Sequence, residues 1–431
     1  EIGVRLVGSE MCIRDSIGGA YMELVQIIGN NIRDLMTARS VTITDLANYL
    51  NVSRQTLQNY LRGSNIIDSV KLVAVSDFFD VPVESLLQSK SSDSSASFLF
   101  RTALNYTLAT ESISEKVYHC INAYNNLAIT LGESTTYFPE QYNLFANIGN
   151  DRLLDINFEC TDYFSHKLKM TSELKEEIRN IAKDQREKLG LHDTNAIAAI
   201  AALQNKGIHI FFVDFGISST NGLSYINDEK GCYIFVNCNA SITLERIIFT
   251  VFHEYGHILL HRPVYKRKFE NCNCKKKSFL DKMADCFAGY FLIPEEYLIS
   301  YRNTTNFVDY ATLFALKQKF QVSLQALVIT MHNYNYLSKE FVNRFYETLD
   351  QKGLRYTEPA SISEQPQVLQ YFQSIKNARI LSMLQTGVMR KCADVKDIQD
   401  ILWMNEKEAT QILEDMQVLF YHAHTQDWLF D

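Results

Sequence analysis

The segment 242–260 is apolar along most of its length, yet residues 253–257 within it read His-Glu-Tyr-Gly-His. Burying imidazole and carboxylate groups inside an apolar helix is unfavourable unless partners satisfy them. Histidines four residues apart project from one helix face, so the ring nitrogens of His253 and His257 can reach one zinc ion at about 2 Å. The alternative is that hydrogen bonds within the core satisfy both histidines. We favour the metal, so the segment predicts a long helix with a zinc site.

Glu254 follows the first histidine and is rotated from it by about 100° around the helix. This direction makes Glu254 a poor third ligand, but it places the carboxylate beside a water that attacks a peptide carbonyl. A carboxylate there can accept the proton of that water and pass it to the leaving amine. The motif therefore predicts peptide hydrolysis, with Glu254 as the catalytic residue and with His253 and His257 as metal ligands.

A tetrahedral catalytic site needs a third protein ligand and one open position. Leu260 and Pro263 stand where a metzincin-type site would have glycine and histidine, which excludes that class. We interpret His261 as an end-of-helix residue. The remaining candidates are Asp281 and Asp285, which lie four residues apart on one face of the next predicted helix. One can bind zinc while the other accepts the second N–H of a ligating imidazole, and the residues alone leave the two roles open.

Ahead of the metal motif the periodicity changes from helical to extended. Residues 207–213, 222–226 and 232–236 have the pattern of strands, and a turn-forming segment lies at 227–231. These runs predict a small sheet that includes an antiparallel hairpin. We expect an exposed strand edge near Val236-Asn237, which could hold a substrate peptide as an added strand.

Residues 22–88 show apolar residues at helical spacing, and residues 44–57 have the order of a helix-turn-helix with Ser53 as the cap of the second helix. The exposed start of a second helix of this kind enters the major groove of DNA, commonly in dimers that read paired half-sites. The residues expected to face DNA are Arg54, Gln55, Thr56, Gln58, Asn59 and Arg62. Gln55 and Asn59 suit adenine edges, and Arg54 and Arg62 suit phosphates. The alternative is a helical bundle for dimerisation or for binding a partner protein, and the acidic residues of the unit make non-specific DNA binding weak.

The segment 89–97 holds six serines in nine positions, which is typical of a linker between domains. Residues 1–16 resemble translated sequencing-adapter sequence, so we interpret residues 1–21 as a non-native or disordered leader and expect the natural protein to begin at Met22. The ranges 98–175, 301–358 and 359–431 are expected to be helical.

Cysteine usage and charge set the expected compartment. The nine cysteines are scattered and odd in number, which suits a reducing compartment better than a disulfide framework. The net charge of −8 gives no global attraction to nucleic acid or membranes. Because no uncharged apolar stretch approaches the roughly 18 residues of a membrane span, we expect a cytoplasmic protein.

The chain resembles two known families. Residues 22–88 resemble a helix-turn-helix domain of the xenobiotic-response-element (XRE) type, and residues 176–300 resemble the ImmA/IrrE family of metallopeptidases. The second resemblance rests on the strands before the motif, on residues 249–261, and on residues 284–288 and 291–294. It implies a gluzincin-like zinc site with Asp281 as the third ligand, where the family usually has glutamate, and Asp285 as the outer partner of His253.

We therefore expect a multidomain, mainly α-helical protein. An all-α helix-turn-helix domain precedes an α+β zincin-like metallopeptidase domain with a small sheet and a helical C-terminal unit. The resemblance implies a zinc-dependent endopeptidase that binds DNA and cleaves a repressor or other regulator in a bacterial or phage/mobile-element switch. One alternative is a transcription regulator whose metal domain is a non-catalytic sensor, although a pure binding site needs no Glu254. A second is a protein-binding module without metal.

Overall fold

The computed structural model describes most of the chain and divides it into two compact units, Glu1–Ser95 and Ala96–Asp431. The described residues are 25–33, 35–36, 41–79, 83–87, 99–102, 108–133, 136–142, 144, 170–217, 220–227, 229–262, 274–302, 309–354 and 357–425. The predicted leader and the Ser-rich segment 89–97 lie outside them. The described chain is mainly helical, as the sequence predicts, and none of its helices is long and apolar enough to cross a bilayer.

The first unit is a small helical bundle. After a helix over 25–33 come α2 (Ile43–Tyr49), α3 (Arg54–Leu61), α4 (Ser69–Phe79) and α5 (Val83–Leu87). The N-termini of α2 and α3 are capped by Thr42 and Ser53, whose hydroxyls accept backbone N–H groups of the first turn. Ile32, Leu46 and Leu57 are fully buried at the centre of the bundle. Capping and burial together fix the orientation of α3.

The second unit contains a sheet surrounded by helices. Its strands are β1 (Leu99–Thr102), β2 (His209–Val213), β3 (Thr220–Asn227) and β4 (Gly231–Asn237). Its first helices are α6 (Leu108–Leu131), α9 (Ser172–Lys188), α10 (Ala196–Lys206), α11 (Leu244–Leu260), α13 (Cys274–Leu292) and α14 (Glu295–Arg302). The later ones are α15 (Tyr310–Phe320), α16 (Leu324–Asn333), α17 (Lys339–Gln351), the 3-10 helix η3 (Ile362–Glu364), α18 (Pro366–Ile375), α19 (Ala378–Met389), α20 (Val395–Leu402) and α21 (Glu406–Thr425).

The four strands lie in the order β1-β3-β4-β2. The predicted hairpin is present as antiparallel β3 and β4, while β2 runs parallel to β4. Our expectation of an exposed edge near Val236-Asn237 is wrong, because Val236 pairs with Gly222 on one side and with Phe212 on the other. The segment 98–175, expected to be helical, contributes strand β1, which pairs antiparallel with β3.

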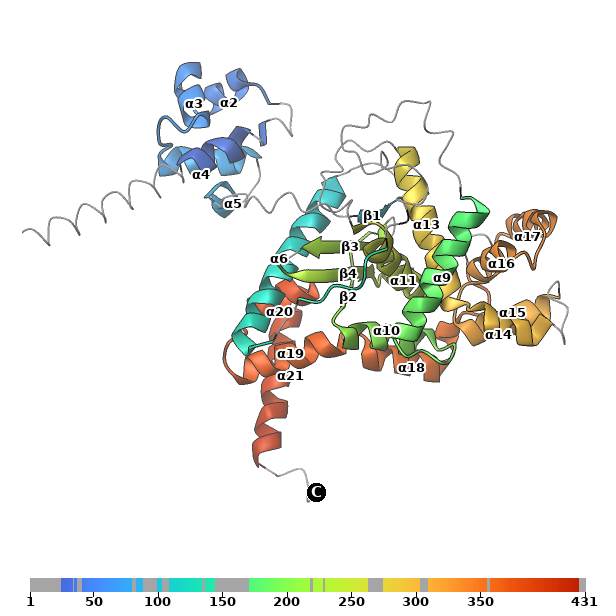
Figure 1. The fold of residues 1–431 in the computed structure, drawn as a ribbon. Coiled ribbons are helices and arrows are strands. Elements are labelled where there is room, and N and C mark those ends of the chain that lie inside the picture. Colours follow the sequence, from blue (N-terminus) through green and yellow to red (C-terminus); the bar gives the residue numbers. More distant parts are fainter. Residues whose placement is uncertain are drawn as a thin grey trace, which may run out of the picture. The chain divides into compact units, whose positions relative to one another are not determined.

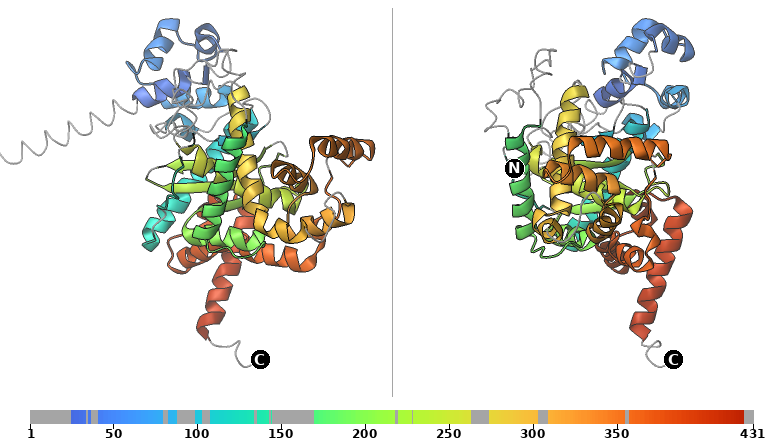
Figure 2. Two further views of the ribbon diagram at one scale, coloured as in Figure 1. Left: turned by 45° about the vertical axis from the view of Figure 1, so that its right-hand side comes forward. Right: turned by 90° about the vertical axis from the view of Figure 1, so that its right-hand side faces the viewer.

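Alternate residues of the strands separate the core into two layers. Phe211, Leu223 and Phe235 point to a layer formed with α6 and α19–α21, whereas Ile210, Ile234 and their neighbours on the opposite face pack against α11 and the helices around it. Figures 1 and 2 show the sheet between these two groups of helices. The metal-motif helix α11 is therefore enclosed by the sheet on one side and by helices on others.

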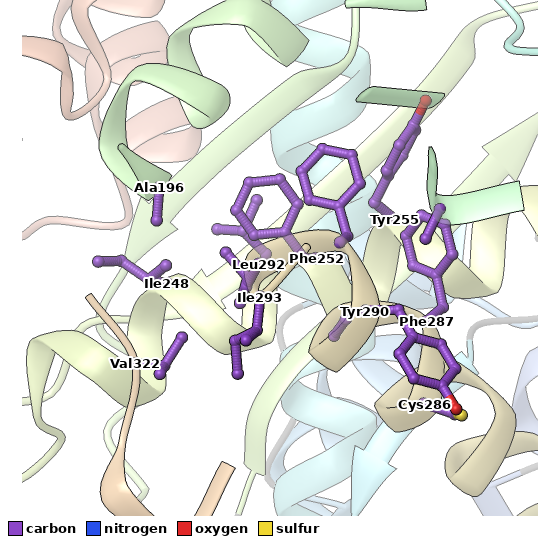
Figure 3. Packing of buried hydrophobic residues seen from close by; sticks show 14 of the residues in the cluster. Ala196, Ile248, Phe252, Tyr255, Cys286, Phe287, Tyr290, Leu292, Ile293 and Val322 are labelled. Atoms are coloured by element: carbon purple, nitrogen blue, oxygen red, sulfur yellow. The ribbon is translucent and has the colours of Figure 1, made fainter. Parts of the chain in front are cut away.

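Helix α13 lies close against α11. Gly256 allows this approach, because a Cβ atom added there would lie 3.0 Å from Phe287 Cδ1 and 3.3 Å from Ala284 Cα. Phe252 stacks on Phe291 with ring centroids 4.6 Å apart, and Figure 3 shows the aromatic packing around Phe252 and Phe287. This interface fixes which face of α13 is turned toward the histidines of α11.

A buried charge cluster holds the first turn of α11. Lys317 Nζ lies 2.9 Å from Glu245 Oε1 and 3.1 Å from Glu358 Oε1, and it donates to the Ala360 carbonyl at 2.7 Å. The Glu245 carboxylate also accepts the Ser361 hydroxyl and the backbone N–H of residue 362. The side chains of Glu245 and Lys317 are fully inaccessible, so each charge depends on the other for compensation.

We predict that Lys317→Met lowers the free energy of unfolding of the second unit by about 3–5 kcal/mol, because removing one partner of a buried ion pair leaves the other uncompensated. Chemical denaturation of the full chain measures the change. Lys407→Met, at an exposed lysine of α21, is the matched control and is expected to have little effect. Equal stability of the two variants would contradict the role given to Lys317.

Candidate metal centre and nucleic-acid interface

Helices α11 and α13 bring two imidazoles and a carboxylate together. The Nε2 atoms of His253 and His257 lie 3.1 Å apart, and Asp281 Oδ1 lies 3.4 Å from His257 Nε2. The ligand atoms of all three residues lie within 4.8 Å of one another. Ligands about 2.0–2.2 Å from a tetrahedral zinc ion lie roughly 3.3–3.5 Å apart, so these atoms fit around one such ion with modest adjustment.

The outer nitrogen of each imidazole also has a partner. His253 Nδ1 lies 2.8 Å from Asp285 Oδ1, and His257 Nδ1 lies 2.8 Å from His261 Nδ1. When Nε2 ligates a metal, Nδ1 carries the proton and donates a hydrogen bond to its partner. This bond fixes the ring tautomer and orientation. Burial, reinforced by the imidazoles of His257 and His253, holds the pKa of His261 well below its usual range, and a neutral imidazole can accept a hydrogen bond at Nδ1.

The role of His261 was missed by the sequence analysis. We interpreted it as an end-of-helix residue, and it does follow the last residue of α11 as its C-cap. It is also one turn beyond His257, however, and that spacing alone would have indicated a contact between the two rings. His261 therefore orients a candidate ligand and is not itself part of the three-residue group.

Strand β3 holds the candidate catalytic carboxylate. Ser224 Oγ donates to Glu254 Oε2 at 2.6 Å, and both side chains are buried. The strand comes close because Gly222 has no side chain: a Cβ atom there would lie 2.4 Å from Thr250 Cγ2 and 3.3 Å from Glu254 Cγ. Ser224 was missed because its pairing with Glu254 depends on how the sheet packs on α11. The motif gives no local signal for it.

Around α11, the partners of the motif come from two sides. Glu254 faces β3, whereas His253 and His257 face α13, as the rotation of about 100° between neighbouring helix residues requires. Asp281 and Asp285 lie on the same face of α13, and their side chains are 28% and 46% exposed. The centre is thus buried on the α11 side and open to solvent on the α13 side.

The predicted DNA-contact residues lie on or directly after α3. Arg54, Gln55 and Arg62 are exposed, and Gln55 Nε2 donates to Asn59 Oδ1 at 3.3 Å. Gln58 and Asn59 are partly exposed. The Thr56 hydroxyl lies 2.8 Å from Ser53 Oγ, so it takes part in the cap of α3. The helix therefore presents amide and guanidinium groups on one face.

Two family models match the chain. Residues 32–86 match a helix-turn-helix domain, and residues 203–332 match the IrrE N-terminal-like domain. These matches confirm the resemblance seen in the sequence: the protein joins an XRE-type helix-turn-helix domain to a peptidase domain of the IrrE/ImmA type. No curated protein and no solved structure matches the chain. Residues 87–202 and 333–431 lie outside both matched ranges.

We predict that Asp281→Ala abolishes stoichiometric zinc binding, because the site would keep only two protein ligands. Asp285→Ala should retain zinc with an affinity about 10–100-fold lower, since it removes only the outer partner of His253. Elemental analysis and competition with a chelator measure both effects on purified full chain. If Asp285→Ala loses the metal and Asp281→Ala keeps it, the roles of the two carboxylates are reversed.

Proposed function

We propose that the protein is a regulatory zinc-dependent endopeptidase that cleaves a repressor or another regulatory protein. The observation that carries this proposal is the geometry of Glu254, which lies beside two imidazoles and a carboxylate suited to zinc and is held by Ser224. A site that only bound metal would have no need of a positioned base next to the ligands. The match to the IrrE N-terminal-like domain supports the same reaction class.

In the proposed reaction, His253, His257 and Asp281 hold zinc. The ion supplies Lewis acidity toward a peptide carbonyl and makes a water acidic enough to be deprotonated near neutral pH. Glu254 accepts the proton of the attacking water and delivers it to the leaving amine. Ser224 orients the Glu254 carboxylate, while Asp285 and His261 keep the two imidazoles in the ligating tautomer.

The first unit supports a role in regulation. We propose that α3 enters the major groove of an operator, that the protein acts as a homodimer on paired half-sites, and that DNA binding places the peptidase near a DNA-bound regulator. A switch of a bacterium or of a phage or other mobile element is the proposed setting. Among the described residues, the cysteines at 120, 232, 238, 286 and 392 form no disulfide, and the proposed compartment is the cytoplasm.

One feature favours a second candidate, a transcription regulator whose metal domain is a sensor. Asp281 has a shorter side chain than the glutamate usual at this position, and a weaker site suits reversible metal binding. The close approach of α13 at Gly256 offsets this difference, since it brings the shorter carboxylate to 3.4 Å from His257 Nε2. We therefore give the peptidase precedence.

We predict that Glu254→Gln keeps stoichiometric zinc but lowers cleavage by about 100–10,000-fold, the usual contribution of a general base. Purified full chain is incubated with a bacterial proteome, and new N-termini are identified by mass spectrometry. An exposed-surface variant, Glu340→Gln, is the control for loss of a carboxylate. If wild type and Glu254→Gln hold zinc and have the same biological activity, the sensor replaces the peptidase.

For the first unit, we predict that Arg54→Ala and Arg62→Ala each weaken DNA binding and lower the salt slope of log K by about one, because each removes one phosphate contact. Fluorescence anisotropy of the full chain, with a duplex selected from a randomised library, measures both quantities. Lys71→Ala is the matched control. Lys71 lies on α4 and pairs with Asp68, which directly precedes that helix, so we do not expect it to contact DNA. Salt-independent binding, or none by wild type, would contradict a DNA-binding role.

A further inference from the structure

A cavity of about 580 Å³ lies beside the metal centre, next to the N-terminal half of α11. Its lining comes from α9, α11, α13, α16, α17 and the loops next to them. Cavities of about 300–1,000 Å³ are of the size that holds ligands. We call this cavity the α11–α16 pocket. Its lining includes Lys175, Arg246, Phe249, Lys282 and Asp285.

The α11–α16 pocket and the candidate metal centre meet at Asp285. Asp285 lines the pocket and also contacts His253 Nδ1 at 2.8 Å. Phe249 precedes His253 by one helical turn and lies on the same side of α11. An extended peptide advances about 3.3 Å per residue. A peptide with its scissile bond at the metal can therefore place a side chain in the pocket within about two residues of that bond.

The pocket carries an excess of positive charge. Lys175, Arg246 and Lys282 reach it from three different helices. Lys175 donates to the neutral amide of Asn333 at 2.9 Å, and within the described part of the chain neither Lys175 nor Lys282 forms an ion pair. Lys175 and Lys282 are therefore available to a bound anion.

The lining also holds two acidic side chains, Glu358 and Asp285, so its three basic side chains outnumber them by one. Glu358 pairs with buried Lys317 at 3.1 Å and accepts the backbone N–H of Leu324 at 3.0 Å. Asp285 is engaged with His253. Burial raises the pKa of the Cys286 thiol to about 12, so this side chain adds no negative charge. The first turn of α11 also borders the pocket, and its dipole adds positive potential.

We propose that the α11–α16 pocket is a specificity subsite of the peptidase that takes an acidic side chain, aspartate or glutamate, within two residues of the scissile bond. The carboxylate binds between Lys175 and Lys282, and the methylene groups lie over Phe249. This inference rests on the proposed function and adds to it the substrate class: regulators that have an aspartate or glutamate within two residues of the cleaved bond.

The test separates peptide binding from cleavage. Zinc-loaded full chain with Glu254→Gln is mixed with a peptide library prepared from a bacterial proteome, and the peptides that co-elute with the protein are sequenced by mass spectrometry. We expect peptides with Asp or Glu to be enriched about tenfold over matched peptides with Asn or Gln, as one charge-assisted contact would give. Adding Lys175→Glu and Lys282→Glu should reverse the preference toward Lys and Arg.

The control is Lys183→Glu with Lys407→Glu, which makes the same change in net charge at exposed positions away from the pocket. This variant should keep the acidic preference. Lys175→Gln with Lys282→Gln is a milder pair that should remove the preference without reversing it, and metal analysis checks that every variant keeps zinc. A reversal of preference cannot result from misfolding.

Each outcome decides a different point. Binding without acidic preference, or an equal loss in the pocket and control variants, overturns the subsite. Wild type incubated with the same library tests the proposed function separately, through the new termini it produces. Acid-selective binding with no cleavage by wild type would refute the peptidase and, with it, the substrate subsite. If wild type cleaves next to Asp or Glu, and only the pocket variants change this preference, the result supports both the peptidase and the subsite.

Discussion

Two imidazoles and a carboxylate buried in one apolar helix constrain the rest of the second unit. His253, Glu254 and His257 are at most 1% exposed, so their polar groups depend on protein partners more than on bulk solvent. Each neighbouring element supplies a partner instead: β3 brings a hydroxyl, α13 brings two carboxylates, and the end of α11 brings a third imidazole. The sheet and α13 can therefore pack on α11 only in the registers that complete these contacts.

Two glycines make those registers possible. Gly222 lets β3 approach the side of α11 that carries Glu254, and Gly256 lets α13 approach the side next to the histidines. The second glycine, Gly256, also affects Asp281, the carboxylate that we propose as the third metal ligand. An aspartate is one methylene shorter than a glutamate, so its carboxylate needs a close approach of α13 to reach the histidines. The contact at Gly256 allows this approach, and Asp281 Oδ1 lies 3.4 Å from His257 Nε2.

Local patterns predicted much of this architecture. Helical spacing and caps located α3 and α11, and the change of period located the hairpin of β3 and β4, because these signals lie within a few residues of each other. The internal position of β4 could not be predicted, since it depends on pairing with β2 across a crossover. The four-residue strand β1 is too short for a periodic signal. Ser224 and Lys317 were missed for the same reason, as their partners are distant in sequence.

The cluster around Glu245 and Lys317 has a consequence for where the peptidase ends along the chain. The family match stops at 332, yet the groups that complete the cluster come from residues 358–362. A polypeptide cut at 332 would open this ion pair to water and strip α19–α21 from the aromatic face of the sheet. The compact second unit therefore extends beyond the matched range and includes α21. The residues that lie after the recognised domain form part of its core.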